Sequence, residues 1–324
     1  MKTKKRKAVL LVLLCATLLM TSCQRQEEEP INYDIGMDTA YEPCSGVPDG
    51  QGKKAHVLLL TGQSNCTGCS IISYLKDQVT PEVFAEYEAG YPSVKINFNI
   101  DNHRTCSEGE FRKTDLLCGS YDEEFGPEVG LASVLAKNFP EEEFFVLKLS
   151  MSGYSLMHHW LRDGQRGEIY GATVLFVQNA LDYLVSMHYD VSLDAVLWMQ
   201  GESDTNEEKA AKYYDNQLAF MGYLREDFAS WAGPDGIYFI DAGISDSPYC
   251  LPGYPTVNRA KEAISKLSPL NLYFSTIDNG LTTMNEPFGE PDLGHYDALS
   301  EIRLGELFGE CVSEIYRKDQ SNNP

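Results

Sequence analysis

The chain has 324 residues, of which 43% are hydrophobic and 23% are charged, as is ordinary for a globular protein with one large domain or two small ones. It has 26 basic and 48 acidic residues, and so a formal net charge of −22. This balance opposes a nucleic-acid partner, because affinity for nucleic acid comes mostly from Lys and Arg that neutralise phosphates.

Residues 1–22 are expected to form a bacterial lipoprotein signal peptide. A basic segment precedes an apolar run at 8–20, which is shorter than the roughly 20 residues of a membrane span and is typical of a secretory signal. The run ends in LMTSC, which resembles a lipobox, so that Cys23 would be lipidated after cleavage. The alternative is an ordinary secreted protein with an incidental cysteine. The pattern predicts a lipid anchor in the cell envelope, at an outer membrane, facing the periplasm or the surface.

Residues 23–52 are predicted to be a flexible tether, because they are polar and turn-rich and show no sustained helical or strand period. In residues 53–324, apolar segments of strand length alternate with amphipathic helical patterns. The expected strands are 56–62, 94–100, 144–150, 193–200, 237–244 and 272–277, and the expected helices are 127–139, 173–188, 207–228, 256–267 and 300–318. This alternation predicts an α/β fold, with a single three-layer α/β/α domain around a mainly parallel sheet.

Three polar, glycine-containing turns follow the first, third and fourth expected strands. They are Gln63-Ser64-Asn65, the segment SMSGYSL at 150–156 and the segment QGESD at 200–204. Ligands of parallel sheets bind beyond the carboxyl ends of the strands. The three turns are therefore expected to open on one edge and to form a site there.

A serine nucleophile requires a base, and His295 is the best candidate among the six histidines. Asp292 lies three residues earlier, where its carboxylate can bind one ring nitrogen and leave the other to accept a proton from Ser64. The tetrapeptide DLGH is weak evidence alone, since Asp and Gly are common in turns. Its position after the sixth expected strand and before the last expected helix strengthens the hypothesis.

Four motifs together resemble the SGNH-hydrolase superfamily. They are GQSN at 62–65, SGYSL at 152–156, LWMQGESD at 197–204 and DLGHYD at 292–297. They are most similar to those of its carbohydrate-esterase branch, which includes sialate O-acetylesterases and plant-type acetylxylan esterases. The resemblance spans roughly residues 55–315 and implies the flavodoxin-like α/β/α fold of that superfamily.

The resemblance also implies roles for particular residues. Ser64 would be the nucleophile, His295 the general base and then acid, and Asp292 the group that orients His295. The oxyanion would be held by the N–H groups of Ser64 and Gly153 and by the side-chain amide of Gln200. Gln63, Asn65 and Glu202 would support the site, with Glu202 in a structural role. No metal and no cofactor is implied.

The chain departs from the family pattern in two places. Ser152 and Tyr154 stand in the second motif where the family usually has Gly and Thr, and Tyr154 could narrow an acyl pocket or stack on a sugar. Cys66 stands where Met is common. With Cys69 it forms a CxxC pair on the helix expected to begin near Asn65, where a helix N-terminus can lower a thiol pKa. The pair is interpreted as structural, with a disulfide expected between Cys66 and Cys69 or from either of them to Cys106 or Cys118.

The residues favour a serine esterase that removes O-acetyl groups from carbohydrates, either acetylated glycans or sialic acid. Its partners would then be an acetylated carbohydrate and, through the lipid anchor, a membrane. One alternative is a catalytically inactive, glycan-binding surface lipoprotein on the same scaffold. Another is a thiol or metal protein built on the CxxC pair, which would leave Gln200, Asp292 and His295 unexplained.

Overall fold

A computed structural model of the chain describes residues 42–283 and 292–322. The predicted signal peptide, Cys23 and most of the predicted tether lie outside these residues. The end of the predicted tether packs on the domain instead of extending from it, since Ser45 forms a β-bridge with Glu110 and Val47 is buried. The domain therefore begins earlier than residue 53. Within the described residues, no helix is both long enough and apolar enough to span a bilayer.

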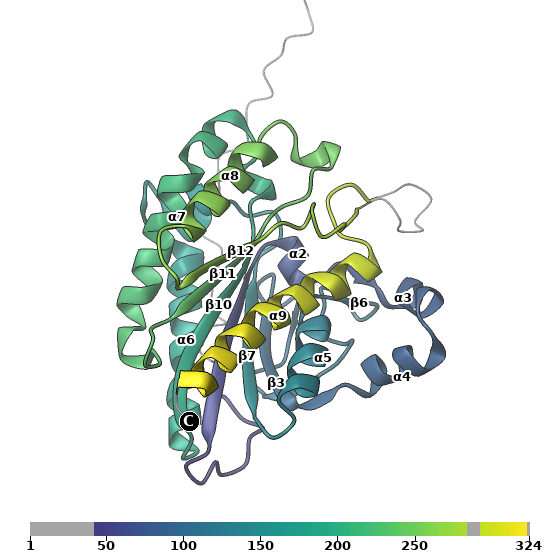
Figure 1. Cartoon of the computed structure of the whole chain (residues 1–324), viewed down its shortest axis with the longest axis vertical. Helices are drawn as coiled ribbons and strands as arrows, with labels where there is room; N and C mark the ends of the chain where they lie inside the picture. Colours follow the sequence, from purple (N-terminus) through teal and green to yellow (C-terminus); the bar gives the residue numbers. More distant parts are fainter. Residues whose placement is uncertain (1–41, 284–291, 323–324) are drawn as a thin grey trace, which may run out of the picture. The chain divides into compact units, whose positions relative to one another are not determined.

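The core of the fold is an eight-stranded sheet in the order β12-β11-β10-β1-β7-β3-β4, with β5 also paired to β3 (Figure 1). Its parallel strands are β1 (Lys54–Gly62), β3 (Tyr91–Ile100), β7 (Phe144–Ser150), β10 (Asp190–Met199), β11 (Tyr238–Ala242) and β12 (Asn271–Phe274). The short strands β4 (Thr105–Cys106) and β5 (Arg112–Thr114) run antiparallel to β3. The predicted mainly parallel sheet is confirmed.

Helices cover both faces of the sheet. α5 (Glu128–Asn138) and α9 (Ala298–Asn322) pack side by side across one face, while α6 (Glu168–Ser186) and α7 (Glu207–Asp227) lie on the other (Figure 1). α8 (Tyr254–Ser265) packs against α7 and β12. The central strand β1 is apolar on both faces, and its residues 57–60 are fully buried, as expected for a strand between two helical layers.

Several short elements were not expected from the sequence. They are the helices α3 (Ile72–Gln78) and α4 (Pro81–Ala89), the two-stranded ladders of β2 (Ser70–Ile71) with β6 (Glu124–Phe125) and of β8 (Leu161–Arg162) with β9 (Gln165–Arg166), the π-helical turn η2 (Leu156–Trp160), and the 3₁₀ turns η3 (Glu202–Asp204), η4 (Ala229–Trp231) and η5 (Pro248–Cys250). Two of these lie at the polar turns: η2 begins at the last residue of the segment 150–156, and η3 lies inside the segment 200–204.

Candidate active site

The three polar turns open on one edge of the sheet, as expected. Gly62 at the end of β1 pairs in register with Ser150 of β7 and with Met199 of β10, so the three strands end level with one another. A cavity of about 530 Å³ opens at this edge, and its lining comprises Gln63, Ser64, Ser152, Gly153, Tyr249, Asp292, Leu293, Gly294 and His295. Ser64, predicted as nucleophile and as oxyanion donor, thus shares a single cavity with the predicted His–Asp pair and with Gly153, a second predicted donor.

Ser64 is the first residue of a single helical turn, α2 (Ser64–Thr67), that follows β1 directly. Only glycine fits before it at position 62, because φ there is +152° and a Cβ would lie 1.9 Å from the Met199 carbonyl oxygen. The first N–H groups of a helix have no partner within that helix. The N–H of Ser64 is one of these, which suits the expected oxyanion donor.

His295 and Asp292 form a hydrogen-bonded pair. Nδ1 of His295 lies 2.6 Å from Oδ2 of Asp292, while Oδ1 of Asp292 accepts from the N–H groups of Gly294 and His295. Burial acts to raise the pKa of the Asp292 carboxyl, but these hydrogen bonds and the His295 charge together hold that pKa below its usual value. Asp292 therefore stays ionised, and Nε2 of His295 is the ring nitrogen left for the cavity.

Asn65 forms hydrogen bonds that connect the turn containing Ser64 to the histidine loop, which comprises residues 292–297. Its Nδ2 donates to the Gly294 carbonyl and its Oδ1 accepts from the N–H of Tyr296, so it is hydrogen-bonded to the residues on both sides of His295. Nδ2 also donates to Oε1 of the buried Glu202 at 2.6 Å. Burial raises the pKa of Glu202, although the Asn65 hydrogen bond opposes that shift. This geometry agrees with a supporting role for both side chains.

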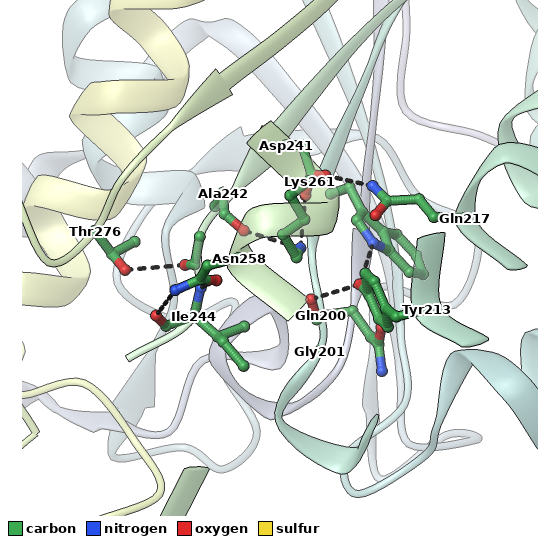
Figure 2. A network of polar contacts seen from close by, with 12 residues as sticks. Gln200, Gly201, Tyr213, Gln217, Asp241, Ala242, Ile244, Asn258, Lys261 and Thr276 are labelled. Atoms are coloured by element: carbon green, nitrogen blue, oxygen red, sulfur yellow. Dashed lines mark hydrogen bonds and ion pairs between the residues drawn. The ribbon is translucent and has the colours of Figure 1, made fainter. Parts of the chain in front are cut away.

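Gln200 does not lie where the sequence analysis expected it. Its side chain is fully buried, and it is absent from the described residues that line the cavity. Nε2 donates to Asp204 at 2.6 Å and to Oε1 of Gln63 at 3.1 Å, while Oε1 accepts from Tyr213. Figure 2 shows Gln200 with Tyr213 in a buried polar network that also contains the ion pair of Asp241 and Lys261.

Gln63 presents the side-chain amide that does line the cavity. Its Oε1 accepts from Nε2 of Gln200 and from the backbone N–H groups of Gly201 and Ser203, at 3.1 to 3.3 Å. Because backbone N–H groups can only donate, the atom that faces them must be the amide oxygen. The Nε2 group of Gln63 is therefore the end of the amide that is left for the cavity.

Residues that the sequence analysis did not single out also shape the site. Tyr249, on η5, is 60% exposed and lines the cavity. Ser247 and Ser70 donate to the carbonyls of Leu293 and Tyr296, which fastens the histidine loop on both sides. Tyr154 is no part of the cavity lining: it packs edge-on against His159 with ring centroids 4.5 Å apart.

The CxxC pair differs from expectation in three ways. The helix ends at Thr67, so Cys69 lies beyond it, and all seven cysteines of the described residues are free thiols. Burial raises the pKa of both Cys66 and Cys69 instead of lowering it. The expected disulfide is wrong because both thiols are free, and the lowered thiol pKa is wrong because burial disfavours the thiolate form of both residues.

A mainly parallel α/β sheet that presents these motifs at its carboxyl edge defines a hydrolase of the SGNH type. The chain belongs to the family described as carbohydrate esterase, sialic acid-specific acetylesterase, whose model matches residues 54–314. The resemblance found in the sequence is thereby confirmed, and the family supports an esterase. No curated protein matches the chain significantly.

Two solved structures share the fold. A protein from Arabidopsis thaliana superposes with a TM-score of 0.58 at 16% identity, over 82% of this chain and 98% of that one. NanS superposes with a TM-score of 0.57 at 13% identity, over 83% of this chain and 99% of NanS. At such identities the likeness supports the fold alone, and it confirms the predicted fold class.

Proposed function

We propose that this protein is a serine esterase that removes O-acetyl groups from carbohydrates. The observation that carries the proposal is the hydrogen-bonded pair of Asp292 and His295 on the wall of the cavity that also holds Ser64. A nucleophile, an oriented base and backbone donors around one cavity are the components that acyl transfer requires.

In the proposed reaction, Oγ of Ser64 attacks the acetyl carbonyl carbon while Nε2 of His295 takes the hydroxyl proton. The oxyanion of the tetrahedral intermediate is held by the N–H groups of Ser64 and Gly153. The intermediate collapses, the C–O bond to the sugar breaks, and His295 gives the proton to the leaving sugar oxygen. Water, deprotonated by His295, then attacks the acetyl-Ser64 ester; the bond between the acetyl carbon and Oγ of Ser64 breaks, His295 returns the proton to Oγ, and acetate leaves. Asp292 stabilises the imidazolium in both steps.

The direct test is acetate release from acetylated xylan, acetylated pectin and O-acetyl sialosides by the purified protein, with Ser64→Ala as the blank. Acetate release from at least one substrate by the wild type alone supports the proposal. Binding of these glycans with no acetate release by either protein would instead identify the inactive glycan-binding lipoprotein.

We further propose that Gln63, and not Gln200, supplies the side-chain amide to the oxyanion. Gln63→Glu keeps an oxygen for the N–H groups of Gly201 and Ser203 but replaces the donor with an acceptor. We expect kcat on a small acetyl ester to fall by about 10²- to 10³-fold, with KM changed only a few-fold, since the contact strengthens in the transition state.

The matched variant is Gln200→Ala, which removes the partner of Gln63 and leaves the buried Asp204 short of a donor. We expect it to lower the thermal midpoint more than Gln63→Glu does. If Gln63→Glu keeps full kcat while a stably folded Gln200→Ala loses it, Gln200 is the donor and the assignment fails.

Tyr249 is proposed as a platform for the sugar ring, because its aromatic side chain lies exposed on the cavity wall. Stacking of this kind contributes about 0.5–1.5 kcal/mol, so Tyr249→Ala should raise KM for an acetylated oligosaccharide by about two- to tenfold. The small ester, which has no sugar ring, should keep its KM. Tyr249→Phe should retain wild-type KM on both substrates, and an equal loss on both in Tyr249→Ala would contradict the role.

We also propose that the protein is anchored in a bacterial envelope through lipidation of Cys23. The support is the order of basic, apolar and small residues before that cysteine. Cys23→Ala should move the protein from the membrane fraction to the soluble fraction, or leave its signal uncleaved, as measured by fractionation and intact mass. A normally processed variant that still partitions with membranes would count against the anchor.

A further inference from the structure

A second cluster of reactive side chains lies outside the cavity, where the turn after β3 and strand β4 meet the segment that precedes β1. Glu42, His103 and Cys106 each offer one ligand atom, and the three atoms lie within 4.8 Å of one another. Nδ1 of His103 is 3.2 Å from Sγ of Cys106 and 3.6 Å from Oε1 of Glu42. All three residues are partly buried.

The two distances from Nδ1 of His103 are close to the separations of ligands around one tetrahedral metal ion. Zn²⁺ binds nitrogen and oxygen ligands at about 2.0–2.2 Å and thiolate at about 2.3 Å, so tetrahedral neighbours lie about 3.3–3.6 Å apart. The set of one imidazole, one carboxylate and one thiolate carries two negative charges, which balance a divalent ion. Thiolate and imidazole favour Zn²⁺, Co²⁺ or Cu²⁺ over Mg²⁺ and Ca²⁺.

The backbone holds the three residues in place. Asn179 donates to the Glu42 carbonyl at 2.7 Å, and the N–H of His103 donates to Oδ1 of Asn99 at 3.0 Å. Cys106 pairs with that same Asn99 across the β3–β4 ladder. The cluster is therefore built on anchored backbone, and binding would need only small side-chain adjustments.

We propose that Glu42, His103 and Cys106 form a binding site for a divalent transition metal, Zn²⁺ foremost, with a fourth position open to water. Coordination takes the thiolate of Cys106 and releases its proton to solvent. This proposal goes beyond the proposed esterase activity and does not depend on it, because none of the three side chains is among the described residues that line the catalytic cavity.

The metal would join the N-terminal segment to the turn that supports the catalytic site. Asp101, on the same turn as His103, accepts from the N–H of Ser152 through Oδ1 at 2.5 Å. Ser152 lines the catalytic cavity. A metal between Glu42 and this turn is therefore expected to act as a structural clamp and not as a catalytic group.

The test uses the full chain without a histidine tag, treated with chelator and transferred to chelator-free buffer. Co²⁺ is titrated and followed by its visible bands and by its thiolate charge-transfer band, and Zn²⁺ is titrated by calorimetry. We expect one tightly bound ion per chain, a thiolate band with Co²⁺, and a higher thermal midpoint with Zn²⁺.

Cys106→Ser should abolish the thiolate band, and His103→Gln and Glu42→Gln should each weaken Zn²⁺ binding at least tenfold. Two controls should bind like the wild type: Cys311→Ser, which removes a distant thiol, and His188→Gln, which breaks another His–carboxylate pair, with Asp49 at 3.2 Å. Absence of a thiolate band in the wild type, or unchanged Zn²⁺ affinity in folded Cys106→Ser, would overturn the proposal. Ester hydrolysis is expected to persist in the chelated protein.

Discussion

Ser64→Ala is expected to lower kcat on a small acetyl ester by about 10⁵- to 10⁶-fold, and His295→Ala by a similar factor. Removal of either the nucleophile or the base stops the same step, and in measured serine hydrolases each loss alone costs nearly as much as loss of the whole triad. The fold should survive in both variants, because each substitution shortens a side chain that faces the cavity. Steady-state kinetics with active-site titration measures the effect.

Asp292→Asn should cost less, about 10⁴-fold. The variant keeps an oxygen for the N–H groups of Gly294 and His295 but places an amide beside the imidazole, so that the base is misoriented without being removed.

Cys66→Met is the control for the thiol hypothesis and should keep activity within a few-fold. A folded Ser64→Ala protein with near wild-type turnover would refute the serine mechanism, and with it the proposed function.

Lys148→Met is expected to give the largest loss of stability, about 3–5 kcal/mol. The Lys148 side chain is fully buried, and its ammonium donates to Glu128 at 2.6 Å and to the carbonyls of Thr67 and Cys118. Removal of the ammonium leaves the fully buried Glu128 carboxylate without its cation. Because Thr67 ends the helical turn that begins at Ser64, the same change should also loosen the catalytic serine.

The loss should depend on pH in a defined direction. Burial raises the pKa of Glu128, although the charge of Lys148 opposes the shift. Without that cation, Glu128 of the folded protein holds a proton at a pH where the same residue of the unfolded chain has released it. The deficit should therefore grow as pH rises above the usual range of a glutamate. Chemical denaturation at pH 5, about half a unit above the usual pKa of a glutamate, and at pH 8, well above it, measures the difference.

Two further variants isolate the ion pair. The double replacement Lys148→Met with Glu128→Gln should recover a large part of the stability, since no unpaired charge remains. Lys266→Met, which breaks an exposed pair with Glu262, should change the free energy of unfolding by less than about 0.5 kcal/mol. A pH-independent deficit that the double variant fails to reduce would show that lost packing, and not charge, causes the effect.

The sheet could be predicted because its strands are buried on both faces. β7 is buried along its whole length and appears in the sequence as the run FFVLKLS, with Lys148 as its single basic residue. The helix α3 escaped prediction because Leu75 is its only buried residue among seven, so it presents no apolar stripe. The two-residue strands β2 and β6 pair across more than fifty residues of sequence, and no local pattern indicates such a ladder.

In the candidate site, too, contacts between residues close in sequence could be predicted, whereas contacts between distant residues could not. Asp292 and His295 are three residues apart, and their hydrogen bond follows from local geometry. Gln63 and Gln200 are both glutamines at strand ends, and only their three-dimensional contacts decide which amide faces the cavity. Tyr249 is more than forty residues from the His–Asp pair in sequence, and chain folding alone brings it to the cavity wall.

The two ends of the sheet bear on how the protein behaves at high local concentration. In the described residues, the outermost strands are β12, of four residues, at one end, and β4 and β5, of two and three residues, at the other. A long unpaired strand would offer a template on which a neighbouring molecule could add its own strand, whereas strands this short offer few free backbone groups. The same sheet that aligns the catalytic turns is thus poorly suited to growth by edge-to-edge strand addition.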